Sequence, residues 1–156
     1  QLNIHQTHLY TSFFNENLTG MMKLTQDNNN NVRTLCLPMG DCKLPVVTVE
    51  DIGKMTVQVM VQGIYGDVGV ASEHLTGNEI AQCLSEALNA EVQYVSVPAA
   101  TYRNFGFPGC QDLANMFEFK QVHNEQFCQQ RNMQNVCSLI NPTPFSVWCI
   151  NNRNLL

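Results

Sequence analysis

The sequence has little charge, and its charges are scattered. Only 13% of the 156 residues are charged, with 8 Lys and Arg against 13 Asp and Glu and a formal net charge of −5. The 18 Asn and 13 Gln side chains supply most of the polarity instead. Because no basic stripe is present to neutralise a phosphate backbone, we expect no direct binding of nucleic acid.

Long apolar runs and regularly spaced cysteines are missing as well. No run approaches the roughly 18 residues that a membrane-spanning helix needs, so we expect no membrane partner. The seven cysteines form no C-x-x-C pair and the four histidines are dispersed, which argues against a disulfide framework and against a metal site. Reduced thiols of this kind predict a location in the cytoplasm, and also in the nucleus.

The patterns that are present alternate between strand and helix. Strand-forming residues lie at 8–14, 32–37, 45–47, 66–71 and 91–97, and helical signals lie at 17–24, after 48, after 76, at 99–104, after 109 and around 145–149. This alternation predicts an α/β or α+β layer structure. The sheet looks incomplete, because none of the expected strands reads as a central, fully apolar one.

Two helix starts have the sequence of a capping box. In the first, we expect the Thr48 hydroxyl and the Asp51 carboxylate to bind free amides at the helix start. In the second, Thr76 and Glu79 form a full box, and an apolar stripe that includes Ile80 and Leu84 follows. The second helix is the clearest in the chain.

No catalytic group emerges from the motifs. Residues 63–69 match G-x-x-G-x-x-G, but an expected helix precedes them and a strand overlaps them, so we interpret them as a turn into a strand. No Tyr is followed four residues later by Lys, and no G-x-S-x-G motif occurs. Glu118, Lys120 and Glu125 read as a solvated helix face, although the stem of Lys120 extends an apolar stripe.

Two segments stand above this background. Residues 13–17 place an aromatic pair and then polar side chains at a strand end, which is where ligands bind in open α/β sheets. The alternative is that the aromatic residues belong to the core and Asn17 caps a helix. Residues 106–117 combine a turn with a helix start, and structural packing is the favoured reading over a ligand surface.

A set of short segments is shared with a known family. The set comprises Phe14, 16–18, 38–41, 49–53, 75–79, Tyr102, 106–109, 112–117, 141–142, Trp148 and 154–156. On these residues the chain resembles the NmrA-like family, whose members are atypical short-chain dehydrogenases. The resemblance implies an α/β fold that is the C-terminal part of an NmrA-like Rossmann-type fold, with the N-terminal dinucleotide-binding half absent. It implies late Rossmann strands at about 1–75 and a smaller C-terminal lobe at about 76–156.

The resemblance also implies a cofactor segment. The family's cofactor-contacting positions that remain are Phe13, Phe14, Glu16 and Asn17, whereas Tyr10 and Ser12 replace the family's usual Arg and Pro. Intact members bind NADP(H). Because the glycine-rich loop is absent, we expect this chain alone to bind it weakly or not at all.

The family's members suggest the function. Most are non-catalytic regulators that sense the NADP(H) ratio and bind protein partners, while relatives such as isoflavone reductases are enzymes. We therefore expect a redox-sensing regulator, with a truncated reductase of the isoflavone-reductase or quinone-oxidoreductase type, or a product without independent activity, as alternatives. An unpaired sheet edge and an exposed apolar face with Phe13, Val68 and Val70 predict marginal stability and association, including homo-oligomers.

Overall fold

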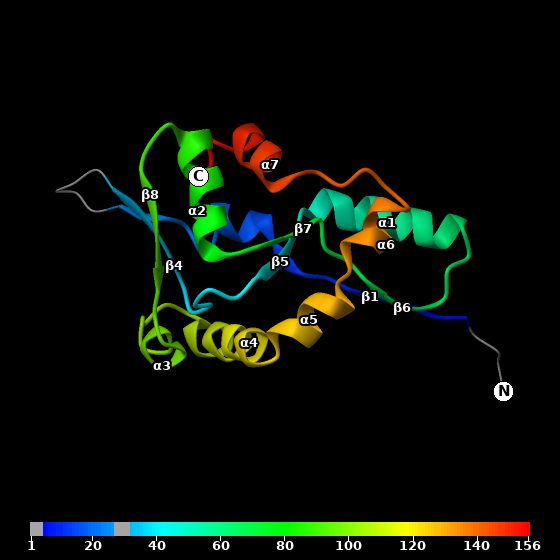
Figure 1. The fold of residues 1–156 in the computed structure, drawn as a ribbon, viewed down its shortest axis with the longest axis horizontal. Coiled ribbons are helices and arrows are strands. Elements are labelled where there is room, and N and C mark those ends of the chain that lie inside the picture. The colour runs from blue at the N-terminus through cyan, green and yellow to red at the C-terminus, as the bar shows by residue number, and fades with distance from the viewer. Residues whose placement is uncertain (1–4, 27–31) are drawn as a thin grey trace.

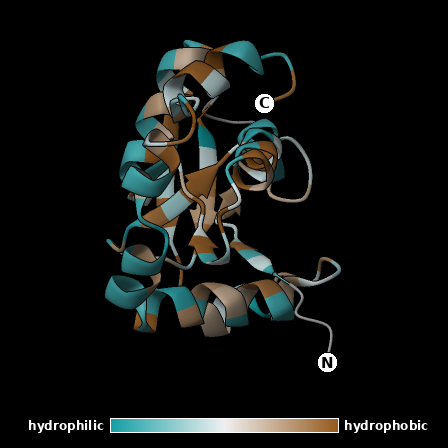
Figure 2. Ribbon diagram, turned by 90° about the vertical axis from the view of Figure 1, so that its right-hand side faces the viewer, coloured by the Kyte–Doolittle hydropathy of each residue, from teal (hydrophilic) through white to brown (hydrophobic). Residues whose placement is uncertain are grey.

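The computed structural model describes residues 5–26 and 32–156. Strands run through the middle of the molecule, and helices lie on both sides of them (Figure 1). The strands carry much of the apolar character (Figure 2). In these residues the strands form three small sheets, with the orders β1-β6, β2-β5-β7 and β3-β4-β8.

The first sheet pairs β1 (Thr7–Tyr10) with β6 (Gly66–Gly69) in parallel. Helix α1 (Val49–Val61) precedes β6, and positive φ angles at Gly63 and Gly66, 64° and 94°, turn the chain from the helix into the strand. Glycine is favoured at both positions because a side chain strains this conformation. The expected turn into a strand at 63–69 is therefore confirmed.

The second sheet contains a strand that the sequence did not reveal as central. Strand β2 (Phe13–Phe14) pairs in parallel with β5 (Leu44–Val47), which pairs antiparallel with β7 (Glu73–Leu75). All four residues of β5 are buried. The expectation of no central apolar strand was wrong, because a four-residue strand containing Pro45 does not stand out from its flanking loops.

The third sheet joins β3 (Thr25–Gln26), β4 (Arg33–Leu37) and β8 (Val92–Ser96), with β4 and β8 parallel. Helix α2 (Gly77–Leu88) covers it and begins with the predicted capping box of Thr76 and Glu79. A Cβ at Gly77 would lie 2.3 Å from the Tyr94 ring, so the absence of a side chain permits the close approach of α2 and β8.

Short helices complete the described fold. They are α3 (Ala99–Tyr102), α4 (Cys110–Val122), α5 (Asn124–Gln130), α6 (Met133–Cys137) and α7 (Phe145–Asn151). Helices α5 and α6 were not expected. The helix expected at 17–24 is instead a 3-10 helix, η1 (Asn15–Thr19), and the strand expected at 8–14 is interrupted between β1 and β2.

The start of α1 differs from the expected capping box. The Thr48 hydroxyl accepts from the Asp51 backbone amide as expected, at 3.0 Å. The Asp51 carboxylate, however, is fully buried and accepts from the amide and hydroxyl of Thr143, at 2.7 and 3.2 Å. The expected capping role for this carboxylate was wrong, because its partner lies far away in the sequence.

The face expected to be exposed is covered. Phe13 is 2% exposed, Val68 6% and Val70 0%. Phe13 belongs to the larger hydrophobic cluster with Phe117 of α4, whereas the two valines pack in a second cluster that includes Val136 of α6. That expectation was wrong because α1, α4 and α6 supply the cover. Among the described helices, none has both the length and the apolar character to cross a bilayer.

Candidate functional site

The four residues predicted to contact a cofactor lie together at the carboxyl end of β2. Phe13 and Phe14 form the strand itself, and Glu16 and Asn17 lie on η1 immediately after it. Phe14 has an extended backbone with φ −76° and ψ 125°. This extended backbone directs Phe13 and Phe14 to opposite faces.

The two aromatic residues have different environments. Phe13 is buried and contacts Phe117, with 6.2 Å between ring centroids. Phe14 keeps 36% of its surface exposed. Only Phe14 of this pair therefore presents a ring that a ligand can contact.

The two polar residues differ in a similar way. Both carboxylate oxygens of Glu16 accept from the backbone amide of Val49, each at 3.2 Å. Glu16 thus neutralises the positive end of α1 and holds η1 against it. The side chain of Asn17 is half-buried and makes no hydrogen bond with the described residues, which leaves it available.

Asn15, between them, is a residue whose importance the sequence did not reveal. Its side chain is 0% exposed, and neither Oδ1 nor Nδ2 has a hydrogen-bond partner among the described residues. A buried, unpaired carboxamide costs about 1–3 kcal/mol, so it marks a place where polar contact is missing. The sequence around Asn15 contains no motif that signals a buried polar side chain.

Two basic side chains adjoin this segment. The Nζ of Lys120 lies 6.0, 5.6 and 5.4 Å from the ring centroids of Phe13, Phe117 and Phe127. The guanidinium carbon of Arg131 lies 3.6 Å from the Phe127 centroid. Its Nε donates to the backbone oxygen of Thr11, just after β1, at 2.8 Å.

The solvated position expected for Lys120 was therefore wrong. Lys120 is only 6% exposed, because it lies one helical turn after Phe117 and α5 brings Phe127 over it. Burial, reinforced by the charge of Arg131, lowers the pKa of Lys120 to about 8. Glu118 instead pairs with Arg103, and Glu125 is exposed.

The turn at 106–109 serves packing and also borders a cavity. Gly109, with φ 84°, precedes α4, and the buried Cys110 thiol contacts the backbone oxygen of Arg103 at 3.2 Å. A cavity of about 520 Å³ lies beside this turn, lined by Arg103, Asn104, Gly106, Phe107, Gly109, Cys110, Gln111 and Asp112. The packing role favoured from the sequence is confirmed for Cys110.

The NmrA-like family matches residues 1–147. The chain belongs to the NmrA-like family.

Within the part of the chain that the structure describes, no cluster of three or more His, Cys, Asp or Glu residues is placed to hold a metal ion.

Solved structures share the fold. NmrA, a negative transcriptional regulator in complex with NADP, is 20% identical with a TM-score of 0.74, over 96% of this chain and 53% of that one. The Citrobacter sp. triphenylmethane reductase complexed with NADP(H) is 17% identical with a TM-score of 0.70, over 96% and 53%. The NADPH-dependent quinone oxidoreductase of Escherichia coli is 20% identical with a TM-score of 0.69, over 97% and 54%. The chain thus spans about half the length of these proteins.

The residues predicted to contact a cofactor are only partly accessible. Phe14 keeps an exposed ring, and the Asn17 side chain makes no hydrogen bond with the described residues, whereas Phe13 and Asn15 are buried. The described residues supply no glycine-rich turn from a strand into a helix that could bind phosphates, because 63–69 lead from α1 into β6.

Proposed function

We propose that this chain is the C-terminal part of a non-catalytic, NADP(H)-responsive regulator that acts through protein contacts in the cytoplasm and the nucleus. The observation that carries the proposal is the Phe14 ring, exposed at the carboxyl end of β2 beside Asn17. The segments 106–109 and 112–117 also resemble the NmrA-like family domain-containing protein 1 type.

The tyrosines of the C-terminal part support binding rather than turnover. The Tyr94 hydroxyl donates to the backbone oxygen of Gly40, at 2.9 Å, and the backbone oxygen of Leu37 lies 3.2 Å away as an alternative acceptor. Burial raises the pKa of Tyr102 to about 12, which makes it a poor proton donor near neutral pH. Both phenols therefore have structural roles.

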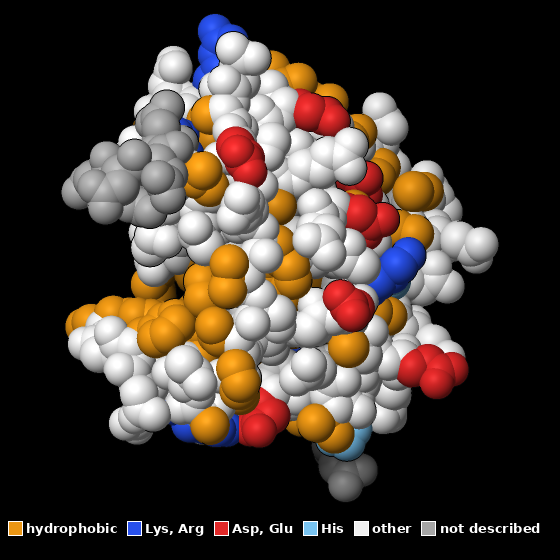
Figure 3. Space-filling model, turned by 60° about the vertical axis from the view of Figure 1, so that its left-hand side comes forward, with side chains coloured by type: hydrophobic (Ala, Val, Ile, Leu, Met, Phe, Trp, Pro, Cys, Tyr) orange, Lys and Arg blue, Asp and Glu red, His pale blue; other side chains and the backbone are white. Residues whose placement is uncertain are grey.

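An apolar surface supports the protein contacts. Figure 3 shows hydrophobic side chains gathered on one face of the molecule. A groove of about 270 Å³ is lined partly by Met21, Tyr102, Phe105 and Phe107, with Met21 66% and Phe105 43% exposed. Large exposed apolar side chains around one groove are typical of a surface that binds a partner.

Hydrogen exchange of the 156-residue chain with NADP⁺ and with NADPH tests the proposal. We expect millimolar cofactor to slow exchange at residues 14–17, and Phe14→Ala to abolish the effect. Phe119→Ala, which removes a ring that is 56% exposed on α4, is the matched control. Calorimetry should give a dissociation constant above about 10 µM, which means a binding free energy weaker than roughly 7 kcal/mol. No cofactor effect on residues 14–17 at any concentration would contradict the proposal.

A reductase is the second candidate, because Lys120 offers a proton near neutral pH beside Phe13. Oxidation of NADPH by the chain, with a quinone or a triphenylmethane dye as acceptor, would support it, provided that Lys120→Met abolishes the oxidation. If the chain neither binds the cofactor nor oxidises NADPH, the remaining interpretation is a product without independent activity.

A further inference from the structure

Lys120 and Arg131 form no ion pair with an acidic residue among the described residues, whereas several other cations do. Among the described residues, ion pairs join His8 to Asp67, Lys54 to Glu50 and Asp51, and Arg103 to Glu118. Neither Lys120 nor Arg131 takes part in one. An ammonium group that is almost fully buried without a counterion is costly, so the missing negative charge requires an explanation.

The two cations lie on the same ring. The Nζ of Lys120 is 5.4 Å and the guanidinium carbon of Arg131 is 3.6 Å from the Phe127 centroid. Arg131 is anchored beyond β1 by its bond to the Thr11 backbone oxygen, and Lys120 is close to Phe13 of β2. Arg131 therefore lies beyond the carboxyl end of β1, where ligands bind in α/β sheets, and Lys120 lies beside the first residue of β2.

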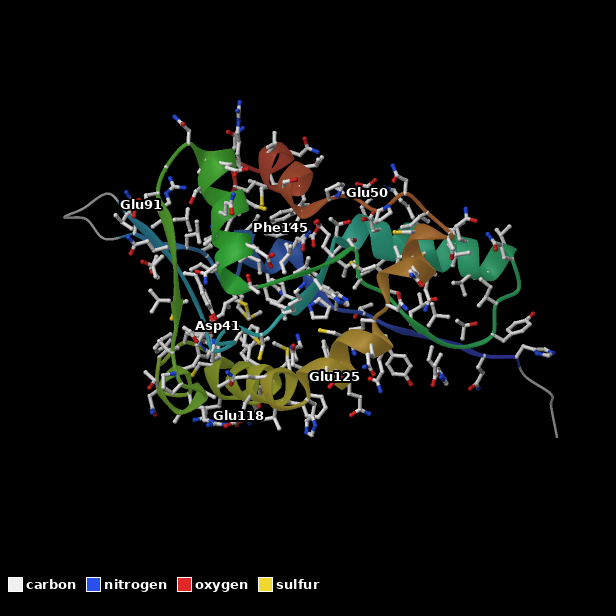
Figure 4. The ribbon with its side chains drawn as sticks, in the orientation of Figure 1. Asp41, Glu50, Glu91, Glu118, Glu125 and Phe145 are labelled. Atoms are coloured by element: carbon white, nitrogen blue, oxygen red, sulfur yellow. The ribbon has the colours of Figure 1, made fainter. Side chains whose placement is uncertain are left out.

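The acids of the helices around Lys120 either bind other groups or are exposed. Glu118 of α4 pairs with Arg103, and Glu125 of α5 is exposed and accepts from Gln129 (Figure 4). Asp112, at the start of α4, is exposed beside the cavity at the turn.

The described acids near β1 and β2 also have partners. Glu16 of η1 accepts from the Val49 amide, and Asp67 of β6 pairs with His8. Among the described residues, the charge that acts on Lys120 is that of Arg131, which lowers its pKa further after burial.

Asn15 supplies an uncharged polar group two residues after Phe13, at the start of η1. Its carboxamide is fully buried and has no hydrogen-bond partner among the described residues. Two cations thus lie on one aromatic cluster, and a buried amide follows the Phe13 ring of that cluster closely in the chain.

We propose that Lys120 and Arg131 form a binding site for a small oxyanion, a carboxylate or a phosphate, with the Nδ2 group of Asn15 as an additional donor. The Nε and Nη1 groups of Arg131 donate to the backbone oxygens of Thr11 and Phe127, so its Nη2 group supplies the donor for a carboxylate or phosphate, and Lys120 supplies a point charge. The site requires neither a dinucleotide nor turnover, so it goes beyond the regulatory function proposed above.

The reactivity of Lys120 in the unaltered protein tests the site directly. The 156-residue chain is treated with limiting acetic anhydride at pH 8, and modification of each lysine is quantified by peptide mass spectrometry. Phosphate, acetate and chloride are compared at equal ionic strength, and a fourth sample contains NADPH in chloride. We expect phosphate or acetate to reduce modification of Lys120 at least threefold relative to chloride, because an anion holds the amine in its charged form. Exposed Lys23 is the internal control and should not respond.

Variants give a second readout. The melting temperature should rise with the protecting anion in the unaltered chain and in Lys23→Met, but not in Lys120→Met or Arg131→Gln. Protection by phosphate alone identifies a phosphoryl ligand, and protection by acetate alone identifies a carboxylate. Equal reactivity of Lys120 in all three salts would overturn the proposal. Protection by NADPH without protection by either small anion would also overturn it, because the cations would then belong to the dinucleotide site.

Discussion

Asp51 and Thr143, 92 residues apart in sequence, are joined by two hydrogen bonds to one buried carboxylate. Ser72 and Lys54 donate to the same carboxylate, at 3.3 and 3.2 Å. Asp51 thereby ties α1 to the loop after β6 and to the segment that leads into α7.

Asp51→Asn should lower the free energy of unfolding by about 2–3 kcal/mol, because an amide nitrogen replaces an oxygen that accepts from buried donors. Urea unfolding measures the change. Glu50→Gln is the control, since that exposed side chain pairs only with Lys54 and should contribute less than about 1 kcal/mol. Equal midpoints for the two variants would show that the Asp51 contacts contribute little.

Gly69→Ala should destabilise the chain by about 1–3 kcal/mol. A Cβ at Gly69 would lie 1.7 Å from the backbone oxygen of Gln130, so the end of α5 must move. Gly53→Ala, on α1, meets nothing within 4 Å and should instead stabilise by about 0.5–1 kcal/mol. Opposite shifts in melting temperature are expected, and a neutral Gly69→Ala would contradict the close contact.

Lys120→Met should stabilise the chain in a way that depends on pH. The pKa of Lys120 is lowered from 10.5 to about 8 in the folded chain, so the unfolded chain holds more protons between these values and the stability of the unaltered chain rises with pH. The gain from Lys120→Met should be about 3 kcal/mol at pH 7 and about 1 kcal/mol at pH 10. Urea unfolding in chloride buffers measures it, and a gain that does not change with pH would contradict the buried charge.

Thr76→Ala should lower the free energy of unfolding by about 1 kcal/mol through loss of the α2 cap.

Hydrogen bonds from the Thr76 amide and hydroxyl lower the pKa of Glu79 below 4.5. The carboxylate therefore contributes stability above that pH, and the contribution is lost as the pH falls through the lowered pKa. Glu79→Gln should therefore weaken the dependence of the melting temperature on pH between about 3 and 5. An unchanged profile would exclude this cap as the source of acid sensitivity.

The elements that the sequence predicted well depend on neighbouring residues. Helix α2 was predicted because Thr76 and Glu79 are three residues apart and the apolar stripe follows at once. The burial of Lys120 was not predicted, since it depends on Phe13 from β2 and Phe127 from α5. The environments of the candidate site residues could be predicted only in part for the same reason. Phe14 and Asn17 remain at the surface, but Glu16 binds α1, and no described residue forms a hydrogen bond with the buried side chain of Asn15.

The parallel pairing of β1 with β6 also determines the order in which the chain can fold during synthesis. His8 and Asp67 face each other across this pair and are 59 residues apart. At about 5–20 residues per second, the ribosome needs roughly 3–12 seconds to add that many residues, and β1 has no partner in this sheet until then. Within the described sheet, the pairing of β1 with β6 can therefore form only several seconds after β1 is synthesised.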